Sequence, residues 1–508
     1  MPTIVLATLN ARYHHASLGL RYLAANMGEH AQDTQIMEFI LQSNPEEVIE
    51  AILAAQPRIV GFGVYIWNVA EITRVVTLLK CVAPQIIVVL GGPEVSFECE
   101  QQEIVRLADY VITGWGDISF AKLCRELLLK RPQAQKVIAG LQPQLAEIKL
   151  PYALYSDNDI ANRTLYVEAS RGCPFKCEFC LSSLDKTAWA FDLELFLAEM
   201  DTLYQRGARQ FKFVDRTFNL NIKASARILE FFLERLDDKL FVHFEVIPDH
   251  LPAPLKELIL RFPAGSLQFE VGIQTFNADV QARISRKQDT AKTEENLRWL
   301  SEQSHAHVHV DLIIGLPGED MASFAQGFNR LVALRQQEIQ VGVLKRLRGT
   351  DIIRHTATYD MRYTPYAPYT VLATNCIDFT TMQRLVRFAR YWDLVANSGR
   401  FPQALPLLLG DSPFAHFMAF SDWLYATTRK THQIPLDRLF DLVYRGMVEC
   451  LSSPQTETFA AVERDFILSG SKEVPAFLKT GKPDEYGIRK AKQASRSSRQ
   501  DRHLVKDA

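Results

Sequence analysis

Three cysteines lie close together near the middle of the chain. Cys173, Cys177 and Cys180 form a Cys-x3-Cys-x2-Cys pattern in a short loop that also contains glycine and proline. Thiolates spaced this closely can turn toward one point, and soft sulfur ligands suit iron–sulfur clusters or zinc. A structural zinc site has four ligands, but residues 181–190 contain no further cysteine or histidine. The pattern therefore favours a [4Fe–4S] cluster with one iron open to an added ligand, with a zinc loop and a two-electron redox site as alternatives.

The cysteine loop directly follows the first strand of a repeated strand-then-helix pattern. The intervening helices are clearest at residues 193–205, 223–236 and 322–335. The six strands are expected at residues 164–169, 210–214, 241–246, 267–273, 307–314 and 340–345. Six such units predict a partial (β/α)6 barrel, in which the chemistry lies at the carboxyl ends of the strands.

Polar side chains occur at or near the ends of these strands. Asp215, Arg216 and Thr217 follow the second strand, and Glu270 and Gln274 belong to the fourth. A charged side chain inside an apolar strand is costly unless it is paired, which favours a functional role for Glu270. For the group after the second strand, an ion pair between the aspartate and the arginine together with helix capping is the alternative.

The first 145 residues show a second strand-and-helix alternation. Strands are expected at residues 3–8, 35–39, 58–65, 86–91 and 110–113, and helices at residues 17–29, 45–55, 68–82 and 117–130. Ser17 and Asn68 are the expected N-caps of two of these helices. Apolar strands with helical crossovers predict a Rossmann-like, doubly wound parallel sheet that binds its ligand beyond the strand carboxyl ends. No Gly-x-Gly-x-x-Gly follows the first strand, so a dinucleotide-binding domain is not indicated.

The residues after these strands are candidate ligand contacts. Glycines among them allow a ligand to approach the backbone closely, whereas ordinary loop residues and packed aromatic rings are the alternatives. The candidates are Asn10, Arg12, Tyr13, Tyr65, Trp67, Gly91, Gly92, Pro93, Glu94, Val95, Gly114 and Gly116.

The cysteine spacing, with the aromatic Phe179 before the last cysteine, resembles the signature of the radical S-adenosylmethionine (SAM) superfamily. Residues 311–319 are similar to the superfamily's fifth-strand motif, against which the adenine of SAM packs. The resemblance implies that the three cysteines hold the catalytic cluster. It implies a SAM-binding role for Phe179, Asp215, Arg216, Thr217, Glu270, Gln274, Arg286, Ile314 and Gly315.

The segment Gly91–Val95 and its place in the order of strands resemble the cobalamin-binding domain that precedes many radical SAM enzymes. The resemblance implies that the candidate contacts of the first domain bind cobalamin. Such relatives usually have Gly-Glu-Gly-Glu where this chain has Gly114-Trp115-Gly116-Asp117. The Asp-x-His-x-x-Gly motif, which supplies an axial histidine in one type of cobalamin domain, is absent. We therefore interpret His14 and His15 as loop histidines near the corrin or at the surface.

Taken together, the resemblances imply a cobalamin-dependent radical SAM enzyme that reductively cleaves SAM at a [4Fe–4S] cluster. A methyltransferase acting on an unactivated carbon or phosphorus centre is expected. A radical cyclase or rearrangement enzyme of the anaerobic Mg-protoporphyrin monomethyl ester cyclase type is the alternative, followed by a non-catalytic sensor of cobalamin or the cluster. The expected partners are a small-molecule or peptide substrate and an external electron donor of the flavodoxin or ferredoxin type.

The last strand of the expected barrel is followed by a basic segment. Lys345, Arg346 and Arg348 could meet an anionic substrate, the periphery of cobalamin or water. We interpret this segment as a solvated face.

Length and composition set the remaining expectations. With 508 residues, 47% hydrophobic and 23% charged, the chain is long enough for about three domains. We expect a cobalamin-binding domain at 1–145, a radical SAM barrel at 160–355, a mostly helical domain at 356–470 and a disordered basic tail at 471–508. The net charge of −2 favours neither nucleic acid nor an anionic membrane, and no apolar run is long enough to span a bilayer. Eight cysteines with one cluster do not resemble a disulfide framework and predict a cytoplasmic protein.

Overall fold

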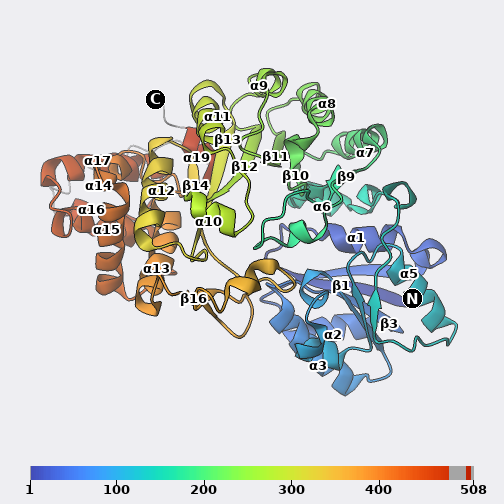
Figure 1. Cartoon of the computed structure of the whole chain (residues 1–508). Helices are drawn as coiled ribbons and strands as arrows, with labels where there is room; N and C mark the ends of the chain where they lie inside the picture. The colour runs from blue at the N-terminus through green and yellow to red at the C-terminus, as the bar shows by residue number, and fades with distance from the viewer. Residues whose placement is uncertain (1, 480–498, 505–508) are drawn as a thin grey trace. The chain divides into compact units, whose positions relative to one another are not determined.

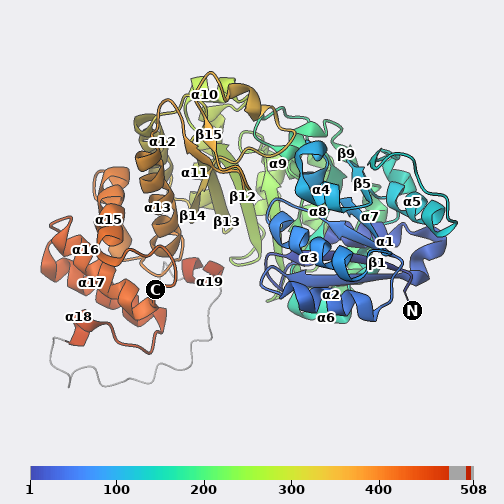
Figure 2. The same cartoon turned by 90° about the horizontal axis from the view of Figure 1, so that it is seen from below.

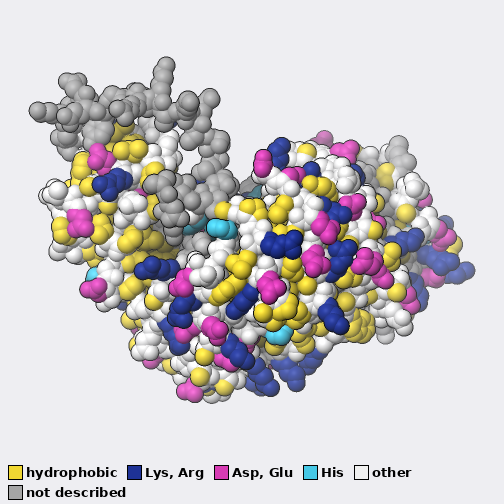
Figure 3. Space-filling view, turned by 90° about the horizontal axis from the view of Figure 1, so that it is seen from above, with side chains coloured by type: hydrophobic (Ala, Val, Ile, Leu, Met, Phe, Trp, Pro, Cys, Tyr) yellow, Lys and Arg dark blue, Asp and Glu magenta, His cyan; other side chains and the backbone are white. Residues whose placement is uncertain are grey.

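The computed structural model describes residues 2–479 and 499–504 (Figure 1). The chain divides into two compact units. The first comprises residues 1–245, 345–354 and 363–370, and the second comprises residues 246–344, 355–362 and 371–508. On the face shown in Figure 3, Lys and Arg side chains are interspersed with Asp and Glu side chains, in keeping with the net charge of −2.

The first unit contains the expected doubly wound parallel sheet. Its strand order is β2-β1-β3-β4-β5-β6, and every neighbouring pair is parallel. The strands are β1 (Ile4–Asn10), β2 (Thr34–Ile40), β3 (Ile59–Gly63), β4 (Ile87–Gly91), β5 (Tyr110–Thr113) and β6 (Val137–Ala139). The central strands are nearly continuous apolar runs because helices cover both faces of such a sheet.

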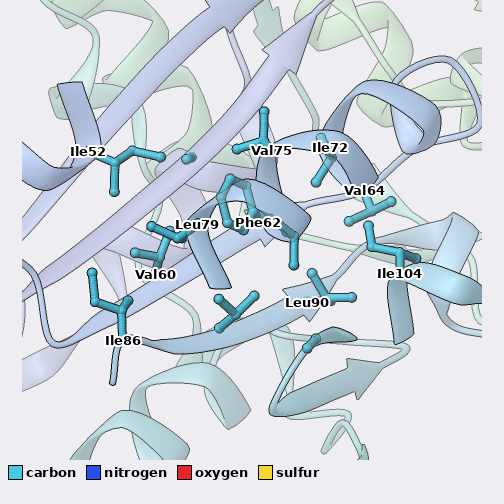
Figure 4. Packing of buried hydrophobic residues seen from close by; sticks show 14 of the residues in the cluster. Ile52, Val60, Phe62, Val64, Ile72, Val75, Leu79, Ile86, Leu90 and Ile104 are labelled. Carbon is cyan, nitrogen blue, oxygen red and sulfur yellow. The ribbon is translucent and has the colours of Figure 1, made fainter. Parts of the chain in front are cut away.

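Five helices form the crossovers of this sheet, and they bury its apolar faces. They are α1 (Leu18–Ala25), α2 (Pro45–Ala54), α3 (Val69–Val82), α4 (Glu103–Leu107) and α5 (Ser119–Leu128). Figure 4 shows Phe62 and Leu90 of the sheet packed with Ile72 and Val75 of α3. Each such side chain contributes ~1.5–3 kcal/mol when fully buried. The sheet edge that carries the candidate residues is therefore held by a well-packed core.

Ser17 and Asn68 both occupy the expected N-cap positions, but only Ser17 makes a capping hydrogen bond with its side chain. The Ser17 side chain accepts from the backbone N–H of Leu20 at the start of α1. Asn68 is fully buried and makes no capping hydrogen bond to α3. Its side chain instead donates to the carbonyls of Leu9 and Gly63, at 3.1 and 3.2 Å. Asn68 thus ties together the ends of β1 and β3 where the candidate ligand contacts lie.

The six strands expected for the barrel are present, and they divide between the two units. In the first unit, β7 (Leu165–Val167), β10 (Gln210–Phe213) and β11 (Phe241–Val246) are parallel in that order, with β11 ending where the units divide. The second unit has the parallel order β12-β13-β14. These strands are β12 (Leu267–Gln274), β13 (His307–Ile314) and β14 (Glu338–Val343).

Helices separate these strands along the chain, which confirms the expected alternation. They are α7 (Leu193–Gln205), α8 (Ile222–Leu233), α9 (Ala253–Ile259), α10 (Ala278–Arg283), α11 (Thr290–Gln303) and α12 (Met321–Ala333). The short helix α6 (Asp157–Asn162) lies in the connector before β7. The small strands β15 (Arg362–Tyr363) and β16 (Val371–Ala373) pair with each other in the segment after β14.

The C-terminal region is helical, as expected (Figure 2). Its main helices are α13 (Phe379–Val395), α14 (Ala404–Leu409), α15 (Pro413–Thr428), α16 (Leu436–Glu449) and α17 (Gln455–Ser469). Phe388 and Trp392 of α13 pack on Phe417 of α15, with ring centroids 5.2 and 5.0 Å away. The tail, for which the sequence predicts disorder, contains the helices α18 (Ala476–Lys479) and α19 (Arg499–Leu504); residues 480–498 and 505–508 lie outside the described residues. Within the described ranges, no helix is long and apolar enough to cross a membrane.

Candidate functional site

A cavity of about 800 Å³ opens at the carboxyl ends of β1, β3, β4 and β5. Its lining residues all belong to the first compact unit. The volume lies toward the upper end of the range for small-molecule sites, ~300–1,000 Å³, and so suits a large ligand. Seven of the residues predicted to bind cobalamin line this cavity: Asn10, Tyr65, Trp67, Gly91, Gly92, Gly114 and Gly116.

Aromatic rings and glycines give the cavity its shape. Tyr65 and Trp67 stack with their ring centroids 4.4 Å apart, and Trp67 is 49% exposed although it is apolar. At Gly92, which has φ +111°, a Cβ atom would lie 2.4 Å from the carbonyl oxygen of Val64. At Gly114, with φ +68°, a Cβ would meet no atom within 4 Å. A flat aromatic surface beside exposed backbone fits a broad, flat ligand such as a corrin.

The other five predicted contacts do not line the cavity: Arg12, Tyr13, Pro93, Glu94 and Val95. Glu94 is 4% exposed, and its carboxylate accepts from Arg348 Nε at 2.9 Å and from the Tyr369 hydroxyl at 2.6 Å. Glu94 therefore holds the segment that follows β14. The cobalamin-binding roles of the five remain predictions.

The basic segment after β14 is not a solvated face at Arg346 and Arg348, so that interpretation is wrong for these two residues. Arg346 makes two hydrogen bonds of 3.0 Å to the carboxylate of Glu98. Arg348 Nη1 donates to the same carboxylate at 2.8 Å. Burial opposes the ionisation of Glu98, but the two arginines outweigh it and lower the pKa of this carboxyl.

The three cysteines lie in a loop whose two ends are paired with each other. The strands β8 (Ser170–Arg171) and β9 (Trp189–Ala190) are antiparallel and enclose the loop. Cys173 and Cys177 are each 8% exposed, and Cys180 is half-buried. Burial raises the pKa of Cys173, and the neighbouring thiols of Cys180 and Cys177 add to this effect. Metal coordination removes such protons, so a cluster is compatible with two buried thiols and a third that is half-buried.

The described residues were also searched for side chains arranged around a single metal ion. Within residues 2–479 and 499–504, no group of three or more His, Cys, Asp or Glu side chains is arranged to hold one metal ion. This finding includes Cys173, Cys177 and Cys180, so their role as cluster ligands remains a prediction from their spacing, their enclosing loop and their burial.

Asp215, Arg216 and Thr217 lie beside the start of the cysteine loop. Asp215 is 3% exposed and accepts from the Ala169 N–H at 3.0 Å and from the Ser170 hydroxyl at 2.5 Å. Burial raises the pKa of Asp215 to about 7. Arg216 lines the cavity and pairs with Glu245, with Nη1 2.6 Å from Oε1. Asp215 thus fixes the approach to the cysteine loop, while Arg216 faces the ligand space.

The remaining predicted SAM contacts belong to the second unit, except Phe179, which is half-buried in the cysteine loop. Gln274 has φ +71° at an irregularity of β12, and Arg286 donates to the carbonyl of Gly272 in the same strand. Ile314 is fully buried, and a Cβ at Gly315 would lie 2.6 Å from Val371. Glu270 is half-buried in β12. Their roles in SAM binding remain predictions.

His15, interpreted from the sequence as a loop histidine near the corrin or at the surface, lines the cavity, and its Nδ1 is hydrogen-bonded to the Tyr166 hydroxyl at 2.5 Å. Burial, helped by His14 and Lys212, lowers the pKa of His15 to about 4, so the ring is neutral at pH 7. The sequence offers no signal for this pairing, because the two residues are 151 positions apart.

Arg171 and Asp185, which flank the cysteines, also line the cavity, together with Trp115 and Asp117 of the loop after β5. Their positions next to two recognised motifs are the only sequence signal that could have identified them. The cavity therefore extends from the loops of the Rossmann-like sheet to both ends of the cysteine loop.

Three family models match the chain. Residues 4–124 match the B12 binding domain, and residues 167–331 match the radical SAM superfamily. Residues 357–507 match a family described as a protein of unknown function (DUF4080).

Several curated proteins are similar in sequence. An uncharacterised methyltransferase of Pyrococcus horikoshii is 29% identical over 237 residues, which are 42% of this chain and 51% of that protein. The cobalamin-dependent radical SAM methyltransferase TokK of Streptomyces tokunonensis is 22% identical over 338 residues, covering 58% of this chain and 47% of that protein. The chain thus spans about half the length of these curated relatives.

Solved structures share the fold. The cobalamin-dependent S-adenosylmethionine radical enzyme OxsB has a TM-score of 0.63 at 12% identity, covering 92% of this chain and 84% of that chain. The radical S-adenosylmethionine methyltransferase TsrM from Kitasatospora setae has a TM-score of 0.55 at 15% identity, covering 69% of this chain and 74% of that chain. At these identities the likeness shows a common fold.

Proposed function

The chain joins a B12-binding domain to a radical SAM domain, and from this premise we propose that it is a cobalamin-dependent radical SAM enzyme. We propose methyl transfer to an unactivated carbon or phosphorus centre as its reaction. The methyltransferases among its relatives support this choice. The substrate is a small molecule or a peptide.

One observation carries the proposal. The cavity at the strand ends of the B12-binding domain is also lined by Ser170, Arg171 and Gly172, which lead directly into the three cysteines. A ligand that fills this cavity lies against the cysteine loop without any change in the fold of the first unit. Two cofactors that act on one substrate must be adjacent, and this arrangement supports their adjacency.

The residues of the chain have distinct roles in this proposal. Cys173, Cys177 and Cys180 hold the cluster, and Asp215 fixes the start of their loop through Ala169 and Ser170. When bound, the reduced cluster supplies the electron that cleaves SAM, and cobalamin supplies a carrier for the methyl group.

The walls of the cavity orient the corrin and exclude water. Tyr65 and Trp67 offer a flat apolar surface, and the glycines after β4 and β5 admit the ring edge to the backbone. The neutral ring of His15 adds a hydrogen-bonding group to the cavity wall without adding charge.

We also infer an external one-electron donor of the flavodoxin or ferredoxin type and a cytoplasmic location. None of the eight cysteines, which all lie in the described part of the chain, forms a disulfide, as is usual in a reducing compartment.

The proposal is tested by anaerobic reconstitution of the full chain with iron, sulfide and hydroxocobalamin. With SAM and dithionite, the protein is expected to produce 5′-deoxyadenosine and S-adenosylhomocysteine. Cys177→Ala should abolish the cluster absorbance and the 5′-deoxyadenosine, because one of three ligands is lost, while cobalamin uptake persists. Cys81→Ala, which changes an exposed thiol in α3, is the matched control and should behave like the wild type.

SAM cleavage that survives in Cys177→Ala would refute the cluster assignment. Bound zinc as the only metal would refute it equally. Once a substrate is identified, a product heavier by one methylene unit supports methyl transfer, and a product of unchanged carbon count supports the cyclase alternative. The absence of 5′-deoxyadenosine from a fully loaded wild-type protein would favour a sensor.

A further inference from the structure

The loop after β5 contacts the first end of the cysteine loop through Arg171. Arg171 Nη1 donates to Asp117 Oδ2 at 2.9 Å, and its Nε donates to Glu168 Oε1 at 2.7 Å. The guanidinium carbon lies 5.0 Å from the ring centroid of Trp115 and 4.4 Å from that of Tyr22. Burial works against the charge of Arg171, but Glu168 and Asp117 outweigh it and raise its pKa. The ion pair between Arg171 and Asp117 is largely withdrawn from water, so it fixes a geometry that a surface pair would not.

The same loop reaches the second end of the cysteine loop through Asp185. Trp115 Nε1 donates to Asp185 Oδ2 at 3.0 Å. The other carboxylate oxygen of Asp185 accepts from the hydroxyl of Thr187 at 2.6 Å. The backbone carbonyl of Asp185 accepts from the N–H of Cys173 at 2.8 Å. Asp185 therefore connects the Trp115 indole to the backbone of the first cluster ligand.

Gly172, which lies between Arg171 and Cys173, is tightly packed on one side. Gly172 has φ +87°, and a Cβ there would lie 2.7 Å from Thr187 Oγ1 and 3.0 Å from the carbonyl oxygen of Asp185. Pairing of β8 with β9 holds Arg171 opposite Trp189. A displacement of Asp185 or Arg171 therefore acts directly on the backbone next to Cys173, through the Cys173 N–H and the tight contacts of Gly172.

We propose that Trp115 and Asp117 are positioning residues that couple occupancy of the cobalamin cavity to the geometry of the cluster loop. Both residues line the cavity and also bond to the two ends of the cysteine loop. Trp115 and Asp117 occupy the two positions at which the cobalamin-binding domains that this domain resembles usually have glutamate. This inference rests on the proposed function for the identity of the two cofactors. It adds the residues through which the cluster loop responds to the cobalamin cavity.

Coupling of this kind is reciprocal. A corrin that packs against Gly114 and Gly116 restricts their loop, and the restriction reaches Cys173 through Trp115 and Asp185. An assembled cluster must then tighten cobalamin binding by the same factor. Coupling between two sites is typically ~5- to 150-fold, so the wild-type protein should bind cobalamin at least ~5-fold more tightly with the cluster than without it.

The experiment measures the dissociation constant for hydroxocobalamin of the full chain, with and without reconstituted cluster. Equilibrium dialysis with cobalt quantified by elemental analysis avoids interference from cluster absorbance. Trp115→Phe keeps the ring over Arg171 and removes only the N–H donor; Asp117→Asn keeps the shape and removes the charge. In each variant, the ratio of the two dissociation constants is expected to fall toward one. Asp117→Glu restores the charge and should recover part of the ratio.

The matched control is Trp67→Phe, which changes another tryptophan of the cavity. Its ring stacks on that of Tyr65, and the substitution leaves the hydrogen bonds of Trp115 and Asp117 in place. It should weaken cobalamin binding with and without the cluster alike and leave the ratio at the wild-type value. A second readout is the electron paramagnetic resonance spectrum of the reduced cluster with SAM. Adding cobalamin should change this spectrum in the wild type and in Trp67→Phe, and should not change it in Trp115→Phe.

Outcomes for this inference and for the proposed function are distinct. A wild-type protein that takes up no cobalt, or no iron, refutes the proposed function. If both cofactors bind but the wild-type ratio is one, or if Trp115→Phe and Asp117→Asn keep the wild-type ratio, the coupling is refuted and the proposed function stands. In a background of Asp185→Ala, which removes the acceptor of the Trp115 N–H, Trp115→Phe should have no further effect; an unchanged loss there would exclude the hydrogen bond as the route.

Discussion

Glu319 keeps a carboxyl group almost entirely out of water. It is 2% exposed, its Oε1 accepts from the Thr275 hydroxyl at 2.5 Å, and its Oε2 is buried without a hydrogen-bonding partner among the described residues. Burial raises the pKa of Glu319 to about 7. Because this folded-state pKa is above the ordinary value of 4.5, the protonated group stabilises the fold below pH 4.5. This contribution is lost as pH rises through 7.

Glu319→Gln is therefore expected to remove the free-energy cost of ionising this buried carboxyl group at higher pH. The amide keeps an acceptor for Thr275 and carries no charge at any pH. The free energy of unfolding of the variant, minus that of the wild type, should rise by roughly 3 kcal/mol between pH 4.5 and 8, since each unit of pKa shift is worth ~1.4 kcal/mol. Urea denaturation across this pH range measures it. Glu302→Gln, at an exposed position, is the control, and an equal pH dependence in both variants would contradict the prediction.

At Gly92, both the backbone conformation and a steric clash exclude a side chain. Its φ of +111° disfavours any side chain, and a Cβ would overlap the carbonyl oxygen of Val64. Gly92→Ala should lower the free energy of unfolding by ~3 kcal/mol, because backbone strain and a steric clash combine. Gly28→Ala, with φ +59° and open space around the added methyl, should cost only ~1 kcal/mol. Equal losses in the two variants, measured by chemical denaturation, would show that packing against Val64 is unimportant.

Residue types indicated the sites better than they indicated side-chain partners. The three cysteines were named as candidates from their spacing, and the glycines after β4 and β5 from their place at the strand ends; their roles remain predictions. Glu94 belongs to the same motif as Gly92, yet its partners Arg348 and Tyr369 are more than 250 positions away. Nothing local in the sequence distinguishes a carboxylate that faces a ligand from one that faces a distant arginine.

At the scale of elements, Arg348 joins the segment after β14 to the loop after β4. Arg348→Ala leaves Glu94, which is 4% exposed, without its cationic partner. Removing one partner of a buried pair costs ~3–5 kcal/mol, so the variant should lose ~3 kcal/mol of stability. Arg362→Ala breaks a pair with Asp360 whose side chains are 70% and 64% exposed, and it should change stability by less than ~1 kcal/mol. Thermal denaturation of both variants compares the two, and similar losses would contradict a buried role for Arg348.

Most strands of both sheets were predicted, but β6 and the smaller elements were not. Parallel strands such as β1 and β4 are continuous apolar runs, which composition alone reveals. The two-residue strands β8 and β9 have no such pattern, because their pairing depends on the loop that they enclose. Asn68 shows the same limit at a helix start, since its hydrogen bonds to β1 and β3 replaced the expected cap.

For the whole molecule, the division into compact units differs from the domains expected from sequence. The first unit continues past the connector to Glu245 and so includes β7, β10 and the cysteine loop. A buried network explains part of this: Arg21 contacts Glu38 and Asp159, and Arg163 contacts Glu38, each at 2.9 Å. These pairs join the first sheet to the connector. Sequence composition marks the polar connector as a boundary, but it cannot show that its charges are buried against the preceding domain.

The pairing of β8 with β9 has a consequence for how iron enters the protein. Closing a loop of chain has an entropic cost, which grows with the length of the loop. The backbone pairing of β8 with β9 offsets part of that cost, because it brings the two ends of the loop together. Assembly of the proposed cluster then has to order only the residues between the two strands. It does not also have to bring the ends of the loop together.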